Sequence, residues 1–151
     1  MKQLIGWIGL ISVLMGFQTS PSKTKNPTKI TVTSPSSSLQ LSLNRGKAVY
    51  LQQCLACHQV NGGGVPHLNA PLDGASAVQG KDKAKLIKIV LKGMTERVEI
   101  DGEEYSNNMA PHADLTDLQI ADVLTYIRKS WTNKASAVTP AEVKAERSKL
   151  R

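Results

Sequence analysis

The feature that most constrains this chain is the run Cys54-Leu-Ala-Cys57-His58, which contains both of its cysteines. On a helical turn, thiols at this spacing lie on one side of the backbone, and the imidazole follows directly. Two cysteines are too few for a domain built on disulfides, and a disulfide at this spacing closes too small a loop to add much stability. The motif therefore indicates a chemical role for the thiols.

Three kinds of site use a cysteine pair of this spacing. A structural zinc site needs four ligands, and without a second cysteine pair only His67 and His112 remain as further donors. A thioredoxin-like redox pair follows a strand in a βαβ unit, whereas a helical pattern precedes Cys54. A histidine directly after the second cysteine is typical of covalent haem attachment, with each thiol bonded to a vinyl group and His58 under the iron. The motif thus favours one covalently bound haem c.

A second axial ligand has to come from elsewhere in the chain, and the candidates are Met94, Met109, His67 and His112. We favour Met109, because Pro111 keeps its segment extended and the 51 residues after His58 suffice to reach the opposite haem face. Met94 directly follows an expected helix end and is interpreted as a packing residue. Both histidines are interpreted as exposed loop residues, and a histidine ligand would give a lower reduction potential than methionine.

The two ends of the chain differ from its middle. Residues 1–17 contain Lys2 and an apolar run of about 14 residues, shorter than the ~20 needed to span a membrane. They predict a secretory signal or, because no clear cleavage site follows, an uncleaved N-terminal anchor. Residues 18–40 are rich in Ser, Thr, Pro and Lys and predict a flexible linker. Residues 135–151 predict a polar extension with a short helix start at Thr139, whose thin apolar face favours fraying.

Residues 41–134 predict an all-α domain of about three to four helices with long central loops. Helical patterns cover residues 43–54, 81–92 and the segment after the capping box at 116–119. A small hairpin on the two-residue turn Asp101-Gly102 is expected between the middle and last helices. Aromatic residues make up only 4% of the chain, so a haem at the centre would supply bulk that the side chains lack.

The charge distribution argues against nucleic acid as a partner. The formal net charge is +7, but residues 41–134 carry 11 cations and 10 acids, so the excess lies at the ends. A nucleic-acid-binding domain concentrates cations on its folded face. Within the domain, residues 81–92 are lysine-rich and residues 96–104 are acidic. These stretches can steer protein partners, although we favour their interpretation as ordinary solvated surfaces.

Residues 41–134 resemble a class I c-type cytochrome domain. They are particularly similar to the small bacterial domains associated with dehydrogenases, copper nitrite reductases and terminal oxidases. The matching segments are residues 45–50, 54–58, 62–66, 98–105, 109–111 and 120–131. The resemblance covers nearly two thirds of the chain, and its haem motif is highly specific.

This resemblance implies roles for several residues. The first and last helices would cross closely through four of them, namely Gly46, Tyr50, Val123 and Tyr126, because a glycine lacks the Cβ that would hold the backbones apart. The Pro66 carbonyl would accept a hydrogen bond from His58 and fix its ring. Met109 would complete the coordination of the iron. The expected haem-binding residues are thus Cys54, Cys57, His58, Pro66 and Met109.

The implied function is one-electron transfer rather than catalysis. Two filled axial positions leave no open site on the iron. We expect an exported protein, periplasmic or at the outer face of the cytoplasmic membrane, that exchanges electrons with a redox donor and acceptor. It would be a monomeric carrier or the haem subunit of an oxidoreductase. A haem peroxidase, or a gas or redox sensor with labile Met109 ligation, is the alternative, although no acid or base is evident for such chemistry.

Overall fold

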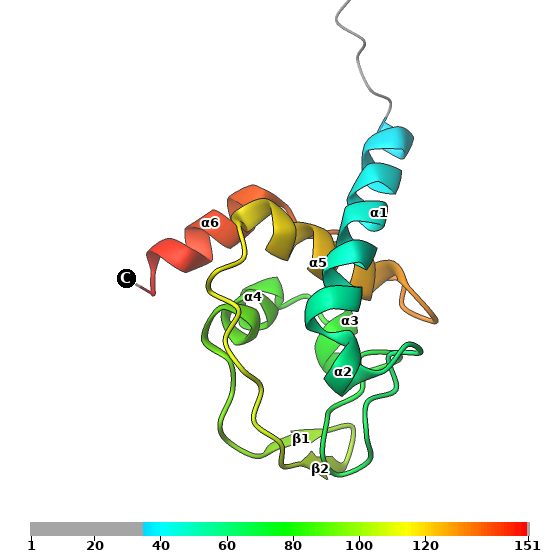
Figure 1. Cartoon of the computed structure of the whole chain (residues 1–151), viewed down its shortest axis with the longest axis vertical. Coiled ribbons are helices and arrows are strands. Elements are labelled where there is room, and N and C mark those ends of the chain that lie inside the picture. Colours follow the sequence, from blue (N-terminus) through cyan, green and yellow to red (C-terminus); the bar gives the residue numbers. More distant parts are fainter. Residues whose placement is uncertain (1–34, 151) are drawn as a thin grey trace, which may run out of the picture. The chain divides into compact units, whose positions relative to one another are not determined.

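The computed structural model describes residues 35–150, which form helices and one short hairpin (Figure 1). The helices within this range are α1 (Pro35–Gln53), α2 (Leu55–His58), α3 (Ser76–Gln79), α4 (Lys83–Lys92), α5 (Asp117–Lys129) and α6 (Pro140–Ser148). Strands β1 (Val98–Ile100) and β2 (Glu103–Tyr105) pair antiparallel, with Val98 opposite Tyr105. The domain is mainly helical, although α2 and α3 are only single turns, and the hairpin precedes α5. The prediction of an all-α domain with a hairpin before its last core helix is therefore confirmed.

Helices α1 and α5 cross at Gly46, and this crossing is the main contact of the fold (Figure 1). A Cβ atom on Gly46 would lie 2.1 Å from the carbonyl oxygen of Asp122 and 2.7 Å from the Cβ of Tyr126. Tyr50 is 1% exposed, and its ring centroid lies 5.5 Å from those of Tyr126 and Trp131. The expected packing of Gly46 and Tyr50 against Tyr126 is therefore confirmed.

Replacing Gly46 with alanine is expected to lower the free energy of unfolding by about 3 kcal/mol, because the added methyl group forces α1 and α5 apart. Gly63→Ala is the control, since an added Cβ there meets the side chain of Asn61, which can move. Denaturant unfolding of the two variants measures the difference. Similar losses in both would contradict the close helix crossing.

The loop that follows α2 is tied to the end of α5. The Asn133 side chain donates to the carbonyl of Leu72 at 2.8 Å and accepts from the backbone N–H of Gly74 at 3.0 Å. Arg128 is 1% exposed, and its guanidinium donates to the carbonyl of Val78. These contacts satisfy buried polar groups and fix the loop against the helical core.

The structure differs from the sequence-based expectation at the start of the domain. Helix α1 begins at Pro35, so residues 35–40 are helical and do not belong to the linker predicted for residues 18–40. Proline is favoured in the first turn of a helix, where its missing N–H costs nothing, so Pro35 was compatible with a helix start as well as with a linker.

The predicted signal or anchor at residues 1–17 lies outside the described residues, as do residues 18–34. Nowhere in residues 35–150 is a helix long and apolar enough to cross a membrane.

The C-terminal segment is also better ordered than expected. Helix α6 begins with a capping box formed by Thr139 and Glu142, and Val143 on its inner face is 0% exposed. Arg147 donates to Asp117 at 2.7 Å and to the carbonyl of Leu115 at 2.6 Å. The helix contacts both α4 and α5, so a narrow apolar face is sufficient to hold it. The folded unit therefore continues through residue 150 instead of ending near 134.

Candidate functional site

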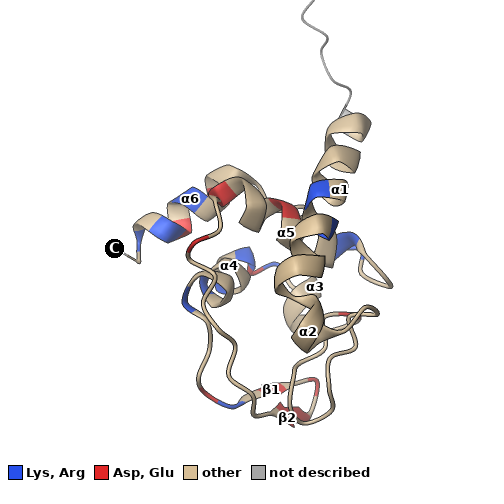
Figure 2. Ribbon diagram, viewed as in Figure 1, with Lys and Arg blue, Asp and Glu red and all other residues tan. Residues whose placement is uncertain are grey.

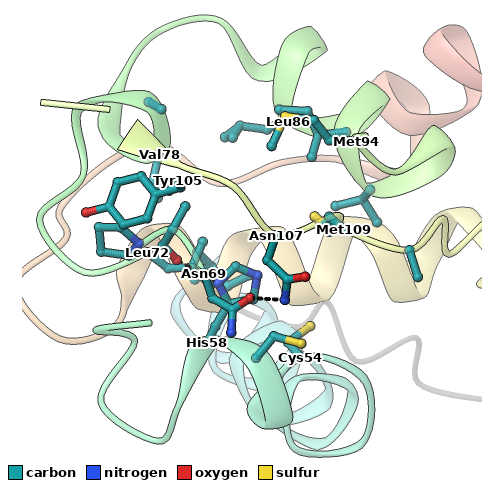
Figure 3. Close-up of a pocket in the computed structure, with 18 of the residues that line it drawn as sticks. Cys54, His58, Asn69, Leu72, Val78, Leu86, Met94, Tyr105, Asn107 and Met109 are labelled. Carbon is teal, nitrogen blue, oxygen red and sulfur yellow. Dashed lines mark hydrogen bonds between the residues drawn. The ribbon is translucent and has the colours of Figure 1, made fainter. Parts of the chain in front are cut away.

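A cavity lies among α2, α4, α5 and the hairpin, and its walls are mainly apolar (Figure 3). Its apolar lining includes Leu72, Val78, Leu86, Val98, Val123 and Ile127. Within the described part of the chain, no Asp, Glu, Lys or Arg side chain lines it. Such walls favour an apolar occupant, with the few polar or sulfur-containing groups setting its orientation.

Cys54 and Cys57 both line this cavity, and their sulfurs are not bonded to each other. The backbone N–H of Cys54 donates to Tyr50, and that of His58 donates to Cys54, both at 2.9 Å, so the motif is held in helical turns. Burial, with a smaller contribution from Cys57, raises the pKa of Cys54 to about 11. The predicted attachment residues thus lie at one wall as neighbouring thiols.

His58 is oriented for use as a ligand. Its Nδ1 lies 2.9 Å from the carbonyl oxygen of Ala70. A carbonyl only accepts, so Nδ1 carries the proton and the lone pair of Nε2 is left free to bind a metal. Burial lowers the pKa of His58, which favours the neutral imidazole.

The carbonyl that holds His58 is not the one predicted. Pro66 is exposed and lies in a tight turn closed by two 2.9 Å hydrogen bonds between the backbones of Val65 and Asn69. The turn carries Pro66 away from the imidazole and brings Ala70 to it, so the prediction for Pro66 was wrong. Ala70 also precedes a proline, which favours an extended backbone there, but sequence spacing alone could not choose between the two loop prolines.

Met109 lies across the cavity from Cys54 and His58 (Figure 3). Its backbone exchanges two hydrogen bonds with Met94, at 2.9 and 2.8 Å, in an isolated antiparallel bridge. Such pairing directs both side chains to the same face, and both methionines line the cavity. Gly93 permits this contact, since a Cβ on it would lie 2.3 Å from the carbonyl oxygen of Met109.

Sequence reasoning missed that Met94 stands beside Met109. A bridge between residues this far apart leaves no local periodic pattern from which to predict it. The interpretation of His112 as an exposed loop residue was also wrong, because it lines the cavity and is partly buried. His67 is exposed, as expected, with its Nδ1 3.6 Å from a carboxylate oxygen of Glu103.

Two asparagines were missed as well. Asn69 and Asn107 line the cavity, and the Nδ2 of Asn107 donates to the Oδ1 of Asn69 at 2.6 Å (Figure 3). They come from different loops, one leading to Ala70 and the other to Met109. The run of polar residues at 106–108 had predicted only the end of the hairpin.

The donor groups of the cavity fit a covalently bound haem. Two free thiols are adjacent, and one imidazole nitrogen has an uncommitted lone pair. A thioether lies on the other side of the cavity, and the walls between are apolar. Soft sulfur and imidazole donors around an apolar space are the ligands that c-type haem iron uses.

Comparison with known proteins agrees with this chemistry. A family model described as cytochrome c matches residues 43–131. The chain is 33% identical over 133 residues to cytochrome c-552 of Thermus thermophilus, a match covering 74% of this chain and 89% of that protein. It is 35% identical over 107 residues to the cytochrome c subunit of a quinone alcohol dehydrogenase from Gluconacetobacter polyoxogenes, covering 65% of this chain. It is also 37% identical over 102 residues to the gluconate 2-dehydrogenase cytochrome c subunit of Pantoea cypripedii, covering 64%. These matches span only 21% and 22% of the two dehydrogenase subunits.

Proposed function

This chain belongs to the cytochrome c family and serves in electron transfer, and from that premise we propose that it is a one-electron carrier with a single haem c. Cys54 and Cys57 would hold the haem covalently, and His58 and Met109 would bind its iron. The observation that carries this proposal is the placement of His58 and Met109 on opposite sides of one apolar cavity beside two free thiols.

The residues of the chain set the properties of the site. A bound haem supplies a reversible one-electron change at its iron. The Ala70 carbonyl fixes the His58 ring and strengthens its donation, and the bridge to Met94 holds the Met109 backbone. A thioether ligand and apolar walls both disfavour the more highly charged oxidised state, so they favour a high reduction potential.

The similarity to cytochrome c-552 and the similarity to the dehydrogenase subunits support two related candidates. The match to cytochrome c-552 covers 89% of that protein, whereas the matches to the two dehydrogenase subunits cover about a fifth of each. The similarity to those subunits is the observation behind the second candidate function, a haem subunit of an oxidoreductase complex. In either case, the apolar run within residues 1–17 and the location of haem-attachment machinery outside the cytoplasm support export to the periplasm or the outer membrane face.

Charged surfaces on two elements are available to steer redox partners. Figure 2 shows basic residues on α4 and acidic residues around the hairpin. Lys85, Lys88 and Lys92 are exposed, whereas Lys83 pairs with Glu142 at 2.9 Å. Steering by such surfaces acts mainly on association rates and weakens as salt is added.

The experiment that tests the proposed function uses protein purified from a host competent in haem attachment. We expect the mass of one haem to remain with the polypeptide under denaturing conditions. A spectroelectrochemical titration should follow a reversible one-electron curve. Colourless protein would contradict the proposal, and tight, rapid carbon monoxide binding to the reduced protein at neutral pH would favour the peroxidase or sensor alternative.

A further inference from the structure

We propose that Asn69 and Asn107 form a side-chain clasp that keeps Met109 at the iron, so that both are positioning residues for the axial ligand. The inference rests on the proposed haem ligation and goes beyond it, since neither asparagine is itself a ligand. Its basis is the 2.6 Å hydrogen bond from the Nδ2 of Asn107 to the Oδ1 of Asn69, made at the edge of the cavity (Figure 3).

The clasp joins the two loops that serve opposite sides of the cavity. Asn69 closes the tight turn that ends directly before Ala70, whose carbonyl holds His58. Asn107 lies two residues before Met109 on the segment that leaves the hairpin. The stretch Asn69-Ala70 therefore contacts both His58, the first proposed ligand, and the segment that carries Met109, the second.

Backbone hydrogen bonds also join the two loops next to the clasp. The N–H of Ser106 donates to the carbonyl of His67 at 3.2 Å, and the N–H of Asn107 donates to that of Leu68 at 3.0 Å. The Ser106 hydroxyl donates to the same His67 carbonyl at 3.1 Å. Residues 106–108 are nevertheless exposed, so water competes for these bonds and the loop is a candidate for local opening.

The clasp lies on the N-terminal side of Met109. After Met109, the chain is held by its bridge to Met94 and by the bond from the N–H of His112 to the carbonyl of Val90 at 2.8 Å. Before Met109, the Asn107 side chain adds its bond to Asn69 to the backbone bonds that Ser106 and Asn107 make with the other loop. Losing the side-chain bond weakens the hold on the segment before Met109, while the backbone bonds between the loops and the bridge to Met94 stay in place.

The test measures how readily imidazole displaces the methionine ligand in the oxidised, haem-loaded protein. A hydrogen bond of ordinary net strength corresponds to a change of about three- to tenfold in this equilibrium. We expect Asn107→Ala and Asn69→Ala each to raise imidazole affinity by that factor. The double variant should gain no more than either single one, because both substitutions remove the same bond.

Two further variants separate the clasp from general damage to the loop. Asn69→Asp keeps an acceptor for the Asn107 amide and should retain an imidazole affinity close to that of the wild type. Asn108→Ala is the matched control, because Asn108 also lines the cavity but its side chain has no hydrogen-bond partner among residues 35–150. It should leave the affinity unchanged.

The outcomes are distinct. Additive effects of the two alanine substitutions, or an effect of Asn108→Ala as large as theirs, would overturn the clasp. Unchanged affinity in both single variants would also overturn it. If the oxidised wild-type protein lacked the methionine–iron absorption band before any substitution, the proposed ligation by Met109 would fail instead.

Discussion

Replacing both Cys54 and Cys57 with alanine is expected to give a colourless protein that no longer unfolds cooperatively. The site has a cavity volume of about 270 Å³ at the centre of the helical domain. Without the haem, the apolar side chains that line the cavity are left facing water, and exposing each of them costs on the order of 1 kcal/mol. Small domains have only about 5–15 kcal/mol of net stability, so the vacant fold would be close to unstable.

The side chains offer little to compensate for this loss. The aromatic cluster of Tyr50, Tyr126 and Trp131 packs on the α1–α5 crossing and is not part of the cavity lining. Leu86, Ile89 and Val90 on α4 line the cavity and would lose an apolar neighbour. We therefore expect α4 and the hairpin to lose fixed packing before the α1–α5 pair does.

Thermal unfolding followed by near-ultraviolet circular dichroism measures this effect, and a haem stain on a denaturing gel checks attachment. Cys54→Ala and Cys57→Ala alone are the matched controls, because each leaves one thiol for attachment. A sharp transition in the colourless double variant, at the temperature of the parent protein, would show that the fold does not depend on the haem.

Sequence patterns predicted those parts of the fold that depend only on residues close together in the chain. The capping box of Thr116 and Gln119 predicted the start of α5, and the Asp101-Gly102 pair predicted the hairpin turn. The same reasoning underestimated α6, whose stability comes from tertiary contacts that a polar sequence does not reveal. Val143 is an example, since only its burial at 0% exposure shows that the segment is part of the core.

The candidate site was predictable where chemistry depends on spacing along the chain. The cysteine motif and Met109 were found in this way, and the structure places all of them at one cavity. The acceptor for His58 depends on how the loop folds. The turn between Val65 and Asn69 brings the carbonyl of Ala70 to the imidazole in place of that of Pro66. The asparagine clasp likewise requires two loops to meet, which no local pattern predicts.

Met109→Leu is expected to abolish the methionine–iron absorption band and to lower the reduction potential by on the order of 0.1 V or more. Leucine has a similar volume, so the packing around the site changes little while the sulfur is lost. Methionine stabilises the reduced iron, and its replacement by water or a nitrogen donor removes that preference. Optical spectra and a redox titration of the purified variant measure both effects.

Met94→Leu is the decisive comparison, because Met94 pairs with Met109 in the β-bridge and also lines the cavity. If Met109 is the ligand, this variant should keep both the absorption band and the potential of the parent protein. Loss of the band in Met94→Leu but not in Met109→Leu would transfer the ligand role to Met94. A Met109→Leu variant with a lowered potential but no affinity for added imidazole would indicate that His112, which also faces the cavity, had taken the vacant position.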